Sequence, residues 1–160
     1  MSKPSGTVDK TVEDMFVQEI YIEKADWHVT VYHEVDNWWA DEIVDKLIKA
    51  GCRGKNLAEA EDMLWHRMRN SGLTYSNLET RETVMVIGIT SSGREYWNTI
   101  DHEKMHLLQN ISQARKIDLF GEEICYISGE FIREIYDKAK GLLCDCCRRK
   151  SVRLRWNRRV

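Results

Sequence analysis

Residues 92–106 read SGREYWNTIDHEKMH, and this run holds the most informative local pattern of the chain. It opens with Ser92 and Glu95 at the spacing of a capping box, in which the serine hydroxyl and the glutamate carboxylate accept hydrogen bonds from backbone amides at a helix start. The pattern therefore predicts a helix from about residue 93 to residue 113. The remaining residues of the run then lie on the surface of this helix.

The same predicted helix carries an H-E-x-x-H motif at residues 102–106. Because His102 and His106 are four residues apart, their imidazoles project from one face, which suits two positions of a tetrahedral zinc ion. Glu103 follows the first histidine, where its carboxylate can act as general base toward a water that the metal activates. We therefore predict a Zn2+ site at His102 and His106. The alternative is a chance motif made of two surface histidines on a solvated face.

A zinc hydrolase keeps three protein ligands and one open position, so a third donor is expected from another segment. Glu122 and Glu123 start the last predicted helix, 16 and 17 residues after His106. Helix phase favours Glu122, which shares a stripe with the small residues Cys125 and Gly129 and would face a closely packed neighbour. Glu123 points about 100° further round the helix and stays the alternative.

Both strands and helices are predicted in the rest of the chain. Two β-rich runs early in the sequence predict a hairpin, and a later β-branched, apolar run predicts a buried strand. Apolar residues at helical spacing predict amphipathic helices. The predicted strands are 16–22, 27–35 and 83–89, and the predicted helices lie between Asp36 and Gly51 and at 56–69, 93–113 and 122–143. The fold class is therefore α+β.

Three segments together resemble the small gluzincin-type metallopeptidases, including the minimal members and the ImmA/IrrE type. They are the strand and loop at 83–92, the motif helix at 98–106, and the glutamate-led helix start at 122–126. The likeness covers about residues 16–143. It implies a zincin-like fold, in which a small mixed sheet packs on the motif helix and on a long C-terminal helix. It also implies that residues 84–89 form an edge strand that holds extended substrate above the metal.

The resemblance assigns a role to each residue of the predicted site. It gives His102, His106 and Glu122 to Zn2+. It gives Glu103 to general acid–base work in the hydrolysis of a peptide or protein amide bond. Larger gluzincins often carry an acid four residues after the ligand glutamate, whereas this chain has Tyr126 there. The Tyr126 hydroxyl would orient an imidazole or stabilise an oxyanion, and the alternative is that Tyr126 is a packing residue.

Length and composition predict one folded domain between two atypical ends. The chain has 160 residues, of which 42% are hydrophobic and 31% charged, a balance that supplies one core. We expect a leader over 1–14, a metallopeptidase domain over 15–143 and a Cys/Arg-rich tail over 144–160. The sequence has no apolar run that spans a bilayer and no secretion signal, so we expect a cytoplasmic protein without a membrane partner.

The tail offers two further candidate interactions. Residues 148–160 hold seven Arg or Lys and no acid, a composition that can bind phosphate backbones. The alternative function is therefore a noncatalytic zincin-like module or a nucleic-acid-associated protein. Cys144, Cys146 and Cys147 form a tempting second metal site, but structural zinc usually uses two C-x-x-C pairs or added histidines. A partner pair is missing here, so Cys52 or another chain would have to contribute. The other interpretation of this cluster is a frayed helix end with oxidisable thiols.

Overall fold

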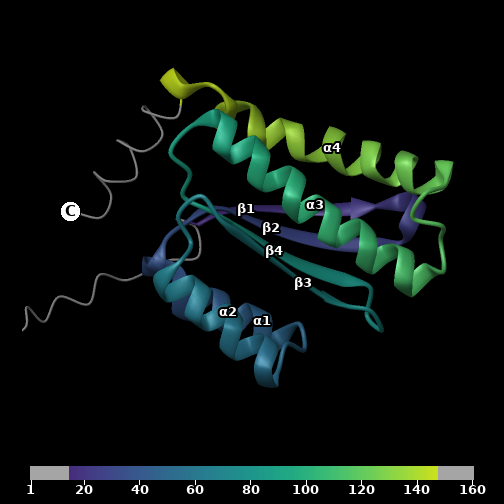
Figure 1. The fold of residues 1–160 in the computed structure, drawn as a ribbon, viewed down its shortest axis with the longest axis horizontal. Helices are drawn as coiled ribbons and strands as arrows, with labels where there is room; N and C mark the ends of the chain where they lie inside the picture. The colour runs from purple at the N-terminus through teal and green to yellow at the C-terminus, as the bar shows by residue number, and fades with distance from the viewer. Residues whose placement is uncertain (1–14, 148–160) are drawn as a thin grey trace, which may run out of the picture.

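The computed structural model describes residues 15–147, which form an α+β fold around one mixed sheet (Figure 1). The strands are β1 (Phe16–Ile22), β2 (Trp27–Val35), β3 (Gly72–Asn77) and β4 (Glu82–Gly88), in the sheet order β1-β2-β4-β3. The α-helices are α1 (Ala40–Lys49), α2 (Gly54–His66), α3 (Gly93–Arg115) and α4 (Glu122–Leu143). A short 3-10 helix, η2 (Glu23–Ala25), lies between β1 and β2, and another, η3 (Asn37–Trp39), lies between β2 and α1. The predicted leader 1–14 and the basic residues 148–160 lie outside the described residues.

The sheet confirms the predicted hairpin but corrects the predicted edge strand. β1 and β2 pair antiparallel, β2 and β4 pair parallel, and β4 and β3 pair antiparallel. The prediction that residues 84–89 form an edge strand is therefore wrong, because β4 lies between β2 and β3. The edge position belongs to β3, which pairs with β4 from Gly72–Ile87 to Asn77–Glu82.

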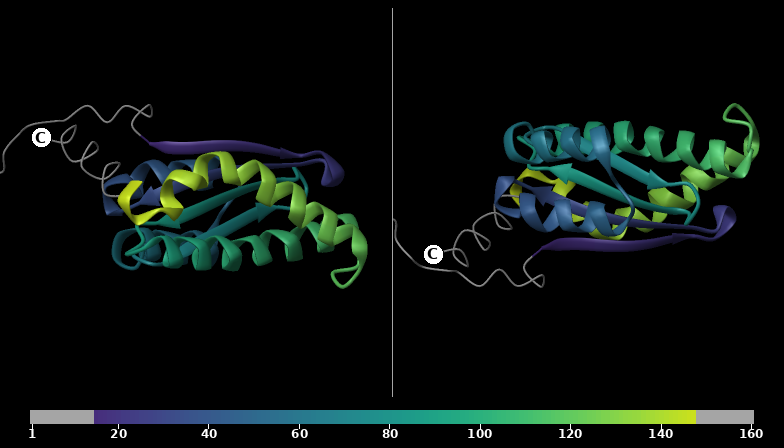
Figure 2. Two further views of the ribbon diagram at one scale, coloured as in Figure 1. Left: turned by 90° about the horizontal axis from the view of Figure 1, so that it is seen from above. Right: turned by 90° about the horizontal axis from the view of Figure 1, so that it is seen from below.

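Helices cover both faces of the sheet (Figures 1 and 2). α3 and α4 pack on one face, and α1 and α2 pack on the other. Side chains along β4 alternate between the two cores, as a strand buried on both faces requires. Met85 and Ile87 join the core under α3 and α4, whereas Val84 and Val86 join the core over α1 and α2.

α3 and α4 form an antiparallel hairpin whose bounds agree closely with the predicted ones. At the start of α3 the Ser92 hydroxyl accepts a hydrogen bond from the backbone N–H of Glu95 at 3.2 Å, as the capping spacing predicted. α3 ends at Lys116, which adopts the left-handed conformation with φ 56°. No helix within residues 15–147 combines the length and the apolar character needed to cross a membrane.

Candidate metal centre

His102 and His106 lie side by side on the exposed face of α3. Their Nε2 atoms are 3.1 Å apart, and their ring centroids are 4.9 Å apart with the ring planes at 75°. Two nitrogens bound to one tetrahedral zinc ion at about 2.0–2.1 Å would be separated by about 3.3 Å. The two nitrogens, which form a hydrogen-bonded pair here, therefore have almost the spacing of two ligands on one zinc ion.

Glu103 points away from solvent, toward the edge strand. Its side chain is only 3% exposed. The hydroxyl of Thr74 on β3 donates a hydrogen bond to Glu103 Oε2 at 2.7 Å, and it also lies 3.4 Å from the Glu103 backbone oxygen. The carboxylate is thus oriented by a neighbouring strand, which leaves its second oxygen without a bond from Thr74.

The start of β3 approaches Glu103 so closely that only glycine fits at position 72. A Cβ on Gly72 would lie 2.7 Å from Glu103 Cγ and 2.9 Å from Glu103 Oε1. It would also lie 2.9 Å from the backbone oxygen of Val86. Contacts under 3.0 Å require an atom to move, so Gly72 and Thr74 together define the place of the Glu103 side chain.

A cavity of about 630 Å³ opens beside these residues, and we call it the motif cavity. It is lined by His102, Glu103 and His106 from the motif, by other residues of α3, by Met63 of α2, and by residues 70–74 that lead into β3. A second cavity of about 340 Å³ continues along β3 between α2 and Asn110. Both cavities are lined by Met63, Leu73, Thr74 and Asn110. The two cavities are thus neighbours along β3, and we call them together the β3 trough.

The structure does not bring Glu122 or Glu123 to the histidines. α3 continues for nine residues past His106 before the chain turns, which at 1.5 Å per residue places the hairpin end about 13.5 Å away along the axis. The helix-phase argument for Glu122 is also wrong. Its companions Cys125 and Gly129 are exposed, and a Cβ on Gly129 would meet no atom within 4 Å.

The buried face of α4 explains this orientation. It is the apolar stripe that packs on the sheet and on α3, made of Ile124, Ile127, Phe131, Ile135 and Ala139. Glu122 and Tyr126 lie off this stripe, and Tyr126 is 62% exposed. Tyr126 does not line the motif cavity, and its exposure does not fit the packing alternative either.

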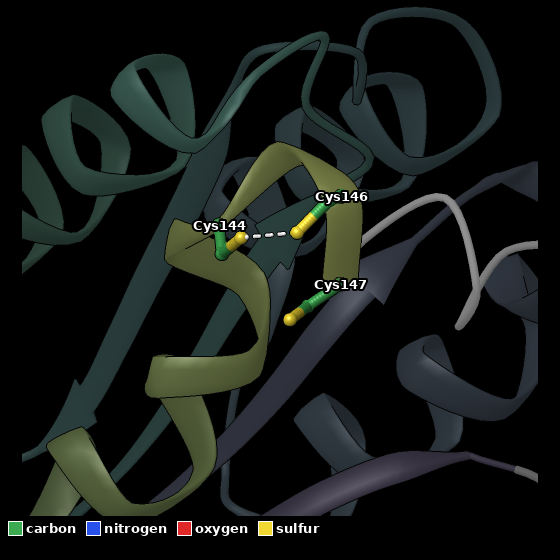
Figure 3. A group of neighbouring side chains, drawn as sticks. All are labelled: Cys144, Cys146 and Cys147. Carbon is green, nitrogen blue, oxygen red and sulfur yellow. Dashed lines mark hydrogen bonds between the residues drawn. The ribbon is translucent and has the colours of Figure 1, made fainter.

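Cys144, Cys146 and Cys147 gather at the end of α4, contrary to the expectation from their spacing (Figure 3). They are the one group of three His, Cys, Asp or Glu residues in 15–147 whose ligand atoms all lie within 4.8 Å of one another, and such a group could hold a metal ion. The sulfurs of Cys144 and Cys146 are 2.8 Å apart. The hydrogen bond from Cys146 lowers the pKa of Cys144 to about 7, and a hydrogen bond with Cys144 raises the pKa of Cys147.

Sequence reasoning missed the edge strand and with it Gly72 and Thr74, the two residues that position Glu103. A period-two pattern was present, because Leu73 and Tyr75 alternate with Thr74 and Ser76. Such alternation predicts a half-buried strand.

The motif, the buried carboxylate and the β3 trough define a candidate centre built from α3 and β3. The chemistry open to this centre is that of two imidazoles and one buried carboxylate beside a cavity. No protein-family model matches this chain, and no curated protein or solved structure shows a match to it.

Proposed function

We propose that this chain is a zinc-dependent peptidase with a zincin-like fold, which hydrolyses a peptide or protein amide bond. One observation carries the proposal: the two imidazoles and the buried carboxylate of a single motif line one cavity beside the last strand of the sheet. A chance pair of histidines on a solvated face does not require an oriented acid or a cavity beside it. The combination therefore favours a catalytic centre.

In this proposal His102 and His106 hold the ion through Nε2. Bound zinc would polarise the scissile carbonyl and make water a stronger acid. Glu103 takes the proton from the attacking water and then gives it to the leaving amine. The Thr74 hydroxyl donates a hydrogen bond to Glu103 Oε2, which orients the carboxylate, and Oε1 lies beside Gly72.

The edge strand supports an extended peptide as substrate. β3 pairs with β4 alone within the part of the chain that the structure describes, so its other edge can pair with a further strand. A peptide that adds to this edge by backbone hydrogen bonds would run through the β3 trough and pass the motif. This is the role that the resemblance gave to residues 84–89, and we now propose it for β3.

The resemblance names Glu122 as third ligand, and a pair of matched substitutions tests this assignment. For Glu122 to reach the ion, the last turns of α3 would have to unwind and bring the start of α4 back toward His106. From the described arrangement we expect Glu122→Gln and Glu123→Gln to retain the same zinc content. A loss of zinc confined to Glu122→Gln would instead support the ligand set of the resemblance.

The function is tested by separating metal binding from catalysis. Protein purified without added metal is expected to contain about one zinc per motif. It is expected to cleave members of a peptide library. Glu103→Gln should keep this zinc and lose cleavage, whereas the His102→Ala, His106→Ala variant should lose both.

Matched controls come from the same chain. Glu123→Gln and His66→Ala change exposed residues that do not line the motif cavity, so both should retain zinc and activity. Cleavage that survives in Glu103→Gln would overturn the proposed mechanism. If the His102→Ala, His106→Ala variant still bound zinc at the motif, the proposed metal site would be wrong.

A further inference from the structure

We propose that Cys144, Cys146 and Cys147 form a second metal site, which holds a thiophilic ion such as Zn2+ or Cu+ through three sulfurs. We call these residues the cysteine triad. Their sulfurs lie within 4.8 Å of one another at the end of α4, and Figure 3 shows the Cys144 and Cys146 sulfurs facing each other across their hydrogen bond. The site goes beyond the proposed peptidase, because no residue of the triad lines the motif cavity.

The segment that carries the triad is fixed to the start of α3. The side chain of Asp145 accepts a hydrogen bond from the backbone N–H of Gly93 at 2.9 Å. A Cβ on Gly93 would clash with the backbone oxygen of Leu143, so only glycine permits this close approach. Residues 145–147 continue as a helical turn after this contact. The segment that carries the cysteines is therefore tied to the start of α3, whereas the three cysteine side chains themselves are exposed.

The donor set selects the class of ion. Within residues 15–147 neither a carboxylate nor an imidazole joins the three sulfurs. A set of thiolates alone prefers soft ions such as Zn2+ and Cu+ over Mg2+ and Ca2+, which prefer oxygen. Two thiolates on one zinc ion are about 3.8 Å apart, because the Zn–S distance is about 2.3 Å. The exposed side chains of Cys144 and Cys146, now 2.8 Å apart, need only a small rotation to reach that spacing.

The triad is remote from the histidines, so the two sites can be measured separately. It lies against Gly93, nine residues before His102, and nine residues of α3 span about 13.5 Å. One ion cannot use donors of both sites at that distance. Thiolate ligation also has its own optical signature, because sulfur-to-metal charge transfer requires a bound thiolate.

The first experiment titrates metal-free protein with Co2+ in the presence of a phosphine reductant. We expect intense sulfur-to-cobalt charge-transfer absorption that saturates at one ion per triad. The absorption should persist in the His102→Ala, His106→Ala variant and disappear when all three cysteines of the triad become serine. A control with Cys52→Ser and Cys125→Ser should keep it. Displacement of Co2+ by Zn2+ or by buffered Cu+ then identifies the preferred ion.

A second readout needs no variant of the triad. Alkylation of the intact protein, followed by mass spectrometry, reports the triad in one peptide, which is separate from the peptide of Cys125. At a free metal concentration of 100 times Kd we expect alkylation of the triad to slow about 100-fold, while Cys125 stays unprotected. Absence of charge transfer, protection equal to that of Cys125, or only a Cys144–Cys146 disulfide in place of metal binding would overturn the proposal. None of these results depends on whether the chain cleaves peptides.

Discussion

Gly72 is the position where one methyl group tests the proposed role of Glu103 most directly. In Gly72→Ala the new Cβ would lie 2.7 Å from Glu103 Cγ and 2.9 Å from the Val86 backbone oxygen. The carbonyl of Val86 belongs to β4 and has little freedom, so the start of β3 and the Glu103 side chain both have to shift, which disturbs the contact between Glu103 and Thr74. Overpacking of this kind costs about 1–3 kcal/mol. If the displacement of Glu103 raises the activation free energy of cleavage by this amount, kcat/KM drops about 5- to 150-fold.

The assay measures peptide cleavage, zinc content and thermal stability on the same preparations of Gly72→Ala and a matched Gly129→Ala control. Zinc content should not change in either variant, because the three atoms nearest a Cβ on residue 72 belong to Glu103 and Val86 and not to His102 or His106. Gly129 is exposed in α4, and a Cβ there meets no atom within 4 Å. The control should therefore keep full activity and gain up to about 1 kcal/mol from helix propensity. Wild-type kcat/KM in Gly72→Ala would refute the reasoning, since the carboxylate would then not depend on the space beside Gly72.

Three further perturbations address the acid, the helix start and a buried phenol. Thr74→Val removes the hydroxyl that donates a hydrogen bond to Glu103. A hydrogen bond to a charged group contributes about 1.5–3 kcal/mol, so the rate of cleavage should fall at least about tenfold while zinc is retained. Thr80→Val, in the exposed turn, should leave the rate unchanged. Ser92→Ala removes the cap of α3 and should lower the free energy of unfolding by about 1 kcal/mol in urea titrations; an unchanged midpoint would contradict the capping role. Burial raises the pKa of Tyr32 to about 12, so the folded state keeps a proton that the unfolded state releases above pH 10. Stability should therefore fall as the pH rises from 10 to 12, and Tyr32→Phe should reduce this loss; identical pH profiles would contradict it.

The parts of the fold that the sequence predicted are those that local residues determine. Ser92 and Glu95 mark the start of α3 because a cap uses residues three positions apart. The motif fixes the pairing of His102 and His106 for the same reason, since helix geometry alone puts residues i and i+4 on one face. The hairpin of β1 and β2 is also local, as only the four residues 23–26 connect the strands.

The parts that the sequence did not predict depend on contacts between distant segments. β4 is internal only because β3 pairs on its far side, and β3 is short and only partly buried, so its own residues give a weak signal. The third-ligand argument failed because it followed the small residues Cys125 and Gly129, whereas Ile124 and Ile127 decide which face of α4 turns inward. Thr74 could not be linked to Glu103 before the position of β3 was known.

The position of β3 at the sheet margin also bears on selectivity. A peptide that lengthens the sheet to a fifth strand would present its side chains alternately to two different walls, because successive residues of a strand face opposite ways. One wall is α3, with the amides of Asn98 and Asn110; the other is α2, with Ala60 and Met63. Residue preferences in the cleaved sequences should then alternate from one position to the next. Polar side chains that hydrogen-bond to the asparagine amides should be preferred at one set of positions, and small or apolar side chains at the other.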